Sequence, residues 1–176
     1  MVRFEMDRRD DQEICFSVEE VERFDAAIVR TLIEIDLQTF AESTFSPYTA
    51  AVLLRNGRVY LLKADDAVIG TCVCMRAWER PNESHILSMG IRPGWRGQGL
   101  GQRFVQAVLQ FMRSRGMRSV SLLVGSDNRR AIRVYTDVGF ETVGHQDGYA
   151  DGDLVVMRAQ LQTEDQAKLI ELPRSE

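Results

Sequence analysis

Residues 85–101 read HILSMGIRPGWRGQGLG, an apolar run that leads into a glycine-rich run. The first part, residues 85–91, has the composition of a β-strand, and the second, residues 96–101, predicts a turn that opens a helix. Such a turn presents main-chain N–H groups at the positive end of the helix dipole, where phosphate groups bind. The stretch therefore predicts both the centre of the fold and a site for an anion.

From residue 85 onward the pattern is strand, helix, strand, helix, which indicates a parallel crossover unit. The helix after the glycine turn is amphipathic and ends at Gly116. A nearly continuous apolar strand is expected at residues 120–124, followed by a helix over residues 128–138. Two further strands, residues 140–145 and 154–161, are expected to close the sheet as an antiparallel pair.

The part of the chain before this centre predicts helices and an antiparallel hairpin. Ser17 followed by Glu20 has the spacing of a capping box, which predicts a helix start at this point. The expected elements are a short strand at residues 14–18, a helix to about residue 40, a second helix from Ser46-Pro47 to about residue 54, and hairpin strands at residues 59–63 and 67–78.

Length and composition indicate one soluble domain over residues 1–176, with residues 162–176 polar enough to be a tail. The chain is 44% hydrophobic and 27% charged, and it has no apolar run near the ~18 residues of a membrane span. Its first residues alternate acids and arginines, so we expect no export signal and a cytoplasmic location. Cys72 and Cys74 lie in a strand-like run and are expected to be small buried hydrophobes.

Charge is distributed unevenly along the chain. The formal net charge of -4 disfavours a general nucleic-acid-binding protein. Between Arg96 and Arg133, however, the acid Asp127 is outnumbered by eight arginines. A positive field around the glycine turn would attract a polyanionic ligand. A nucleic-acid module built on these arginines is the least favoured of three functional hypotheses.

Two well-known phosphate-binding loops do not fit the glycine turn. A P-loop requires Gly-Lys-Ser/Thr, which does not follow here. A dinucleotide-binding Rossmann turn requires a third glycine where this chain has Gln102, and an acid about 20 residues further on. The sequence from Gly101 to Ser126 contains no Asp or Glu, so the ribose-binding carboxylate is missing.

The remaining motifs are Arg96-x-x-Gly99-x-Gly101, a preceding strand that ends in Ile91-Arg92-Pro93, and Asn128-x-x-Ala131-x-x-x-Tyr135-x-x-x-Gly139-Phe140. In order and spacing they resemble the core of the GNAT superfamily of acetyl-coenzyme A dependent N-acetyltransferases, tightly over residues 86–140. The outline is similar to bacterial enzymes that acetylate the N-terminus of ribosomal proteins. The resemblance implies an α/β (α+β) fold with a mixed, mostly antiparallel sheet of about six to seven strands. A central parallel pair of strands would splay around the cofactor, with about four flanking helices.

The resemblance also implies a role for each matched residue, with acetyl-coenzyme A as the co-substrate and no metal. Asn128 would contact the pantetheine arm, and Tyr135, two helical turns further on, would protonate the departing thiolate. The implied cofactor-binding residues are Met89, Gly90, Ile91, Arg96, Gly97, Gln98, Gly99, Leu100, Gly101, Gln102, Asn128 and Tyr135. Each role has an alternative: Tyr135 as a core aromatic, Asn128 as a simple N-cap and Arg96 as a solvated surface charge.

The motifs do not identify a general base. Family members carry a carboxylate either in the first core strand, where this chain has Leu87 and Ser88, or in the second, at the position that matches Leu123. Glu83 and His85 lie just upstream and could reach the amine through water, although either could be a surface residue at a strand end. Tyr135 and Glu83 are the catalytic residues that we expect.

The expected function is transfer of acetyl from acetyl-coenzyme A to a primary amine, of a small molecule or a protein, by direct attack in a ternary complex. The alternative is a catalytically silent acyl-coenzyme A binding or sensor domain, suggested by the missing carboxylates. The acceptor would be selected by residues 42–48 and 147–153, whose acids suit a cationic amine. No nucleic acid or membrane partner is expected, and a homodimer is plausible.

Overall fold

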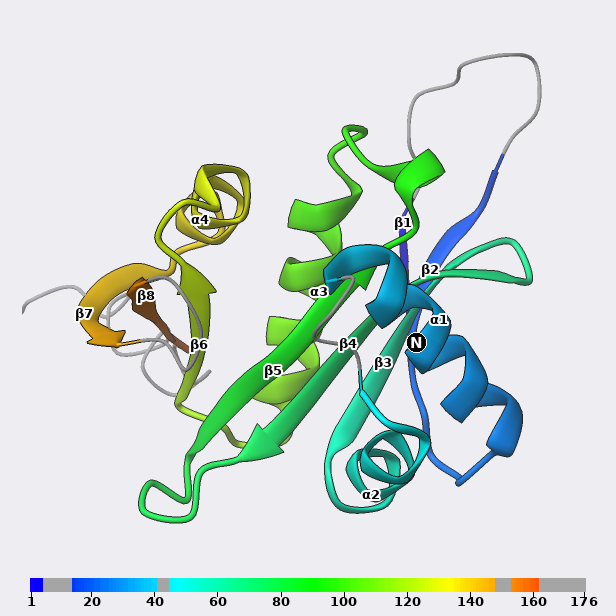
Figure 1. Ribbon diagram of the computed structural model, residues 1–176, viewed down its shortest axis with the longest axis horizontal. Helices are drawn as coiled ribbons and strands as arrows, with labels where there is room; N and C mark the ends of the chain where they lie inside the picture. The colour runs from blue at the N-terminus through cyan, green and yellow to red at the C-terminus, as the bar shows by residue number, and fades with distance from the viewer. Residues whose placement is uncertain (5–13, 41–44, 148–152, 162–176) are drawn as a thin grey trace, which may run out of the picture. The chain divides into compact units, whose positions relative to one another are not determined.

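The computed structural model describes residues 1–4, 14–40, 45–147 and 153–161, and this part of the chain contains eight strands and four α-helices (Figure 1). The strands are β1 (Val2–Phe4), β2 (Phe16–Glu20), β3 (Arg58–Ala64), β4 (Ala67–Arg76), β5 (Glu83–Ile91), β6 (Ser119–Gly125), β7 (Glu141–Asp147) and β8 (Asp153–Gln160). The helices are α1 (Ala26–Phe40), α2 (Pro47–Asn56), α3 (Leu100–Ser114) and α4 (Arg129–Asp137).

The strands are hydrogen-bonded in the order β1-β2-β3-β4-β5-β6-β8-β7. Pairing is antiparallel except between β5 and β6, which run parallel. The mixed, mostly antiparallel sheet with one parallel pair confirms the expected fold class. The number of strands exceeds the expected six to seven, and β1 was not expected at all. With only three residues, β1 is too short to give a pattern, and it pairs with β2 through Val2↔Val18.

The chain divides into two units, and the first consists of residues 1–75 and 86–108. In this unit β3 is apolar over four consecutive buried residues, as expected for a strand that is covered on both faces. Helices α1 and α2 are drawn in front of β3 and β4 in Figure 1. Their buried side chains form one cluster with those strands, comprising Val29, Leu32, Ala50, Leu53, Val59, Leu61 and Val73.

The start of α1 differs from the prediction. Ser17 and Glu20, the expected capping box, lie in β2 and pair with Lys63 and Tyr60 of β3. The pairing with β3 supplies the backbone hydrogen bonds of these residues, so they open no helix. Instead Asp25 caps α1, because its Oδ1 accepts from the N–H of Ala27 over 2.7 Å.

The start of α2 confirms the prediction. Ser46 is the N-cap, and its hydroxyl accepts from the N–H of Thr49 over 3.1 Å. Pro47 takes the first helical position, where a residue without an N–H loses no hydrogen bond.

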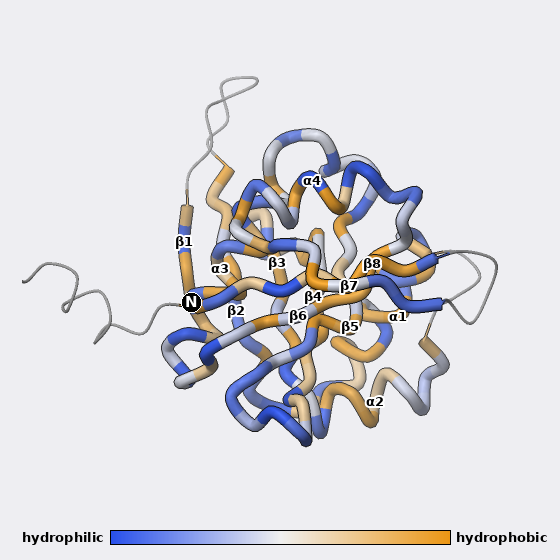
Figure 2. Tube along the Cα trace, turned by 90° about the vertical axis from the view of Figure 1, so that its left-hand side faces the viewer, coloured by the Kyte–Doolittle hydropathy of each residue, from blue (hydrophilic) through white to orange (hydrophobic). Residues whose placement is uncertain are grey.

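The second unit consists of residues 76–85 and 109–176. Its strands β6, β7 and β8 pair antiparallel, with Leu122↔Met157 in register between β6 and β8. The predicted closing pair is therefore confirmed. Helix α4 begins at the expected place, and Gly139, with a φ of 96°, follows its end. Hydrophilic and hydrophobic residues are mixed along this helix (Figure 2).

Three further predictions concern the buried cysteines, the number of domains and membrane-spanning helices. Cys72 and Cys74 are fully buried free thiols whose Sγ atoms lie 3.8 Å apart in a hydrogen bond, which confirms the prediction that both are small buried side chains. The single domain over residues 1–176 stays a prediction, and the proposed tail, residues 162–176, lies outside the described residues. In the described ranges, every helix is too short or too polar to cross a membrane.

Candidate functional site

The end of β5 lies close against α1. A Cβ atom at Gly90 would lie 2.5 Å from Thr39 Oγ1 and 3.1 Å from Ile35 Cγ2, so glycine is required for this approach. Ser88 faces the same helix, because its Oγ donates to Asp36 Oδ1 over 2.8 Å. Alternation along the strand places Met89 on the opposite face.

Hydrogen bonds from the side chain of Arg96 fix the start of the glycine turn. Its Nε donates to the carbonyl oxygen of Ile91 over 2.6 Å, and one terminal nitrogen donates to the carbonyl of Gln38 over 3.0 Å. The same nitrogen lies 3.3 Å from the hydroxyl of Thr39. The alternative of a solvated surface charge is therefore wrong for Arg96. Its side chain holds the turn against the last residues of α1.

The turn that follows has the backbone of an anion site. Gly97 and Gly99 have φ angles of 82° and 74°, in the left-handed region that side chains rarely adopt. Both glycines are exposed, and α3 begins directly afterwards at buried Leu100. Exposed N–H groups at a helix N-terminus attract negative charge, so this arrangement fits a phosphate group.

Asp36 is a buried carboxyl group that the sequence analysis did not single out. It is 2% exposed, and its two oxygens accept from Ser88 Oγ and from the N–H of Phe45 over 3.0 Å. These bonds connect α1 to β5 and to the residue before the N-cap of α2. One signal for Asp36 existed: it falls four residues after Leu32, inside the apolar stripe of the predicted helix.

The second matched motif lies in the other unit, on α4. Asn128 is the N-cap, since its Oδ1 accepts from the N–H of Ala131 over 3.1 Å. The cap uses the oxygen of this carboxamide, so its NH₂ group is the part suited to contact a ligand. Tyr135 is half-buried, and its ring lies 5.5 Å from that of Phe140. The roles of Asn128 and Tyr135 toward a cofactor stay predictions.

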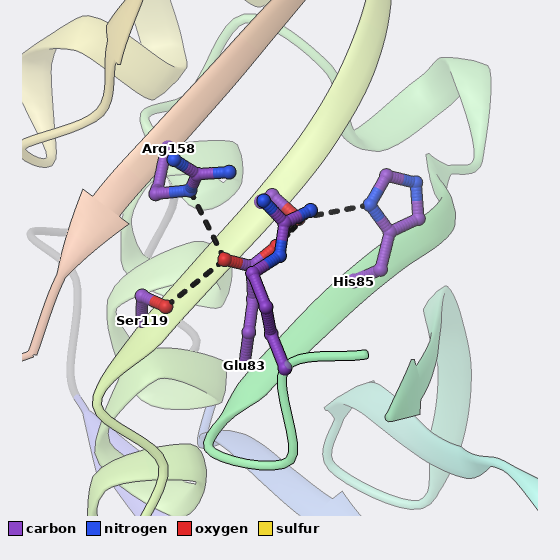
Figure 3. Close-up of polar contacts among 6 residues, drawn as sticks. Glu83, His85, Ser119 and Arg158 are labelled. Atoms are coloured by element: carbon purple, nitrogen blue, oxygen red, sulfur yellow. Dashed lines mark hydrogen bonds and ion pairs between the residues drawn. The ribbon is translucent and has the colours of Figure 1, made fainter. Parts of the chain in front are cut away.

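Glu83 is buried within a polar cluster of the same unit (Figure 3). It is only 3% exposed, so the alternative of a surface residue at a strand end is wrong. Its carboxylate accepts from Ser121 over 2.9 Å and from Ser119 over 3.2 Å. Two arginines, Arg158 at 3.1 Å and Arg80 at 3.2 Å, form ion pairs with it. The Nε of Arg158 makes this contact without the geometry of a hydrogen bond.

His85 joins the cluster from the same strand. Its Nδ1 lies 3.0 Å from Ser121 Oγ, and its ring is half-buried (Figure 3). Burial lowers the pKa of His85 below its ordinary value; the carboxylate of Glu83 acts in the opposite direction, and Arg80 lowers it further. The sequence alone placed Glu83 and His85 near one another, but not Ser119, Ser121 or Arg158, which come from β6 and β8.

The positions without a carboxylate are apolar and accessible. Leu87 of β5 is 43% exposed, and Leu123 of β6 is 39% exposed. Of the acids expected to face the acceptor, Glu42 and Asp151 lie outside the described residues. Asp147 and Asp153 pair directly across β7 and β8. Among the described residues, no three His, Cys, Asp or Glu side chains are grouped so that they could hold a metal ion.

Comparison with known proteins identifies the class. The chain matches the Acetyltransferase (GNAT) family over residues 25–140, and it belongs to this family. The match contains the glycine turn, the strand before it and the whole second motif, so the resemblance that these motifs indicated is confirmed.

Two curated relatives illustrate the similarity. The chain is 26% identical over 107 residues to N-acetyltransferase family 8 member 2 of Rattus norvegicus, which is 59% of this chain and 47% of the relative. It is 44% identical over 67 residues to mycothiol acetyltransferase of Saccharomonospora viridis, 38% of this chain and 22% of the relative. The chain thus spans less than half the length of these curated relatives.

Solved structures show the same fold. The ribosomal-protein-S18-alanine N-acetyltransferase from Escherichia coli superposes with a TM-score of 0.73 at 16% identity, over 84% of this chain and 95% of that one. An acetyltransferase from Bacillus subtilis in complex with CoA superposes with a TM-score of 0.67 at 17% identity, over 84% and 99%.

Proposed function

We propose that the chain is an N-acetyltransferase that moves acetyl from acetyl-coenzyme A to a primary amine. The observation that carries the proposal is the exposed glycine turn, with Gly97 and Gly99 in the left-handed region directly before α3. Arg96 holds this turn from behind. In a GNAT family member, this loop suits the pyrophosphate of coenzyme A.

The residues that would hold coenzyme A are those that match the core motifs of the GNAT family. Main-chain N–H groups of Arg96, Gly97, Gln98, Gly99, Leu100, Gly101 and Gln102 would bind the pyrophosphate. Main-chain groups of Met89, Gly90 and Ile91 would bind the pantetheine and the thioester carbonyl. On α4, Asn128 would contact the pantetheine arm.

Acetyl transfer needs an electrophilic carbonyl, a neutral amine and an acid near the sulfur. The amine nitrogen bonds to the acetyl carbon, the C–S bond breaks, and the thiolate of coenzyme A takes a proton. We assign that proton to the phenol of Tyr135. The amine loses a proton in the same reaction, so a base or water must accept it.

The acceptor is an amine of a small molecule or a protein. The structural and curated relatives include an enzyme for the alanine of a ribosomal protein and a mycothiol acetyltransferase, and both kinds of acceptor are therefore candidates. We also propose the cytoplasm as the location and keep a homodimer as a hypothesis.

The second candidate function is an acyl-coenzyme A sensor without catalysis. The exposed, apolar side chains of Leu87 and Leu123, where family members carry carboxylates, favour it. Calorimetry with acetyl-coenzyme A, followed by mass spectrometry of a panel of amines and peptides, separates the two functions. The acetyltransferase predicts binding and an acetylated amine. Binding without product favours the sensor, and no binding contradicts both.

A further inference from the structure

Two residues that flank the glycine turn contact aromatic rings of the strand pair β1 and β2. Trp95, the last residue of the short 3₁₀ helix Pro93–Trp95, comes directly before the turn, and its ring meets that of Phe16 edge-on, with centroids 5.9 Å apart. Arg103 lies in the first turn of α3, after the glycines, and its Cζ lies 5.4 Å from the centroid of the Phe4 ring. The same pair of strands therefore contacts the chain on both sides of the glycine turn.

The two rings that make these contacts also contact each other. Phe4 and Phe16 are direct partners in the register of β1 and β2, and their rings stack with centroids 5.9 Å apart and an interplanar angle of 6°. Side chains directly opposite each other in an antiparallel pair lie on one face of the sheet. The contacts thus form a continuous chain from Trp95 through Phe16 and Phe4 to Arg103, which we call the aromatic support.

The aromatic support is anchored in the sheet. Phe16 is only 4% exposed, and it pairs with Ala64 of β3 as well as with Phe4. Phe4 lies on β1, the first strand of the sheet order, and is half-buried. All of these residues belong to the same unit as the glycine turn, residues 1–75 and 86–108. The support therefore fixes both flanks of the turn to the strands of this unit.

The glycines give the turn little packing of its own. A Cβ atom added at Gly94 or at Gly99 would meet no atom of the described residues within 4 Å. Glycine also loses more conformational freedom than any other residue when its backbone is ordered. A turn that is already ordered before a ligand arrives loses less entropy on binding, which raises the affinity. Flanks that are fixed at Trp95 and Arg103 therefore favour the binding of an anion.

We propose that Phe4, Phe16 and Trp95 are positioning residues for acetyl-coenzyme A, a role that rests on the proposed function. They hold the two ends of the glycine turn at the separation at which its main-chain N–H groups bind the pyrophosphate. Because their effect passes through the backbone of the turn, it concerns the affinity for the nucleotide end of the ligand and not the chemical step. The strand β1, far from the turn in sequence, thereby belongs to the cofactor site.

The test compares Phe4→Leu with a matched control, Phe24→Leu. Phe24 also lies beneath an arginine, since Cζ of Arg55 is 4.5 Å from the centroid of its ring, but this arginine belongs to α2 and not to a flank of the turn. Leucine keeps an apolar side chain and removes the ring at each position. Calorimetry should give a Kd for acetyl-coenzyme A about five- to tenfold higher in Phe4→Leu, and within about twofold of wild type in Phe24→Leu.

Two further variants complete the comparison. Phe4→Tyr retains the ring and should bind acetyl-coenzyme A like wild type. Trp95→Leu interrupts the aromatic support on the other side of the turn and should weaken binding about as much as Phe4→Leu. Thermal unfolding shows that each variant is folded at the temperature of the binding experiment; if Phe4→Leu is not folded, Trp95→Leu decides.

Acetyl-pantetheine gives a readout that a general loss of structure would not produce. This thioester lacks the pyrophosphate and the nucleotide, so it has no group that the glycine turn would bind. In Phe4→Leu, KM for acetyl-coenzyme A should rise, whereas kcat at saturation, and kcat/KM with acetyl-pantetheine, should stay within about twofold of wild type. An equal loss of kcat/KM with both thioesters would contradict the positioning role.

Failure of the positioning role and failure of the proposed function give different results. If wild type binds no acetyl-coenzyme A, the proposed function fails and the positioning role with it. If wild type binds it but acetylates no amine, the acetyltransferase function fails, and calorimetry of the variants alone decides the positioning role. If wild type binds it, and Phe4→Leu and Trp95→Leu bind it as tightly, only the positioning role is overturned.

Discussion

The Nε of Arg96 donates to the main-chain carbonyl of Ile91 over 2.6 Å, which ties the last residue of β5 to the first residue of the glycine turn. The same guanidinium reaches the carbonyl of Gln38 near the end of α1. A planar group with five N–H donors can satisfy carbonyls in two directions at once. The arginine thus sets the geometry of the turn, and the exposed main chain of the turn remains available to an anion.

Replacing Arg96 with Lys should weaken acetyl-coenzyme A binding about tenfold, or roughly 1.4 kcal/mol. The ammonium of lysine cannot donate in the fixed fork that reaches both Ile91 and Gln38. The matched control is Arg113→Lys at an exposed position near the end of α3, which should bind normally. Calorimetry measures the affinity of both variants for acetyl-coenzyme A. Equal affinities would show that the hydrogen bonds of Arg96 do not set the geometry of the turn.

Tyr135→Phe should lower kcat by about 10²- to 10⁴-fold while the Kd for acetyl-coenzyme A stays within about twofold. The substitution removes only the hydroxyl, so the contact of the ring with Phe140 is preserved. The comparison variant Tyr135→Leu removes the ring as well and should lower both Tm and activity. A Tyr135→Phe enzyme with wild-type kcat would leave only the core-aromatic role.

Local sequence patterns were sufficient to predict most of the helices and strands of the fold. The cap at Ser46-Pro47 and the stop at Gly139 depend on residues that are neighbours in sequence, so both could be predicted. Ser17 and Glu20 have the spacing of a cap, but their pairing with β3 overrides it. That pairing joins residues at least 40 positions apart, and no local pattern contains it.

The candidate site also has one part that a local motif predicts and another that depends on tertiary contacts. The glycine turn is one continuous motif, and it opens a helix, α3, as predicted. The partners of Arg96 and Glu83 are tertiary: Gln38 is 58 residues from Arg96, and Ser121 is 38 residues from Glu83. Only the order of strands brings β6 and β8 to Glu83, so the buried cluster could not be read from the sequence.

Asp36 and Ser88 should be energetically coupled. Asp36→Ala leaves the hydroxyl of Ser88 and the N–H of Phe45 without their acceptor, which should cost about 2–4 kcal/mol of unfolding free energy. Ser88→Ala should cost about 1–2 kcal/mol. The double variant should be more stable than the sum of the two losses predicts, by roughly 0.5–2 kcal/mol. Urea unfolding measures the cycle, with Ser114→Ala at an exposed position as the control; strict additivity would show that the contact contributes nothing.

The lowered pKa of His85 predicts a dependence of stability on pH with a definite sign. In the unfolded chain the imidazole has its ordinary pKa of about 6.5, whereas burial lowers the pKa in the folded protein. Between these two values the unfolded chain binds more protons, so the free energy of unfolding falls as the pH falls. More than about one pH unit above 6.5 both states are neutral and this contribution to the pH dependence disappears.

His85→Gln removes the titrating group, so the unfolding free energy of this variant should depend less on pH than that of wild type from about pH 6.5 downward. His145→Gln, at an exposed position of β7, is the matched control variant. Urea unfolding at half-unit steps of pH measures the three curves. If the stability of wild type relative to His85→Gln instead fell as the pH rose through about 6.5, the folded protein would stabilise the charged form of the imidazole, and the lowered pKa would be wrong.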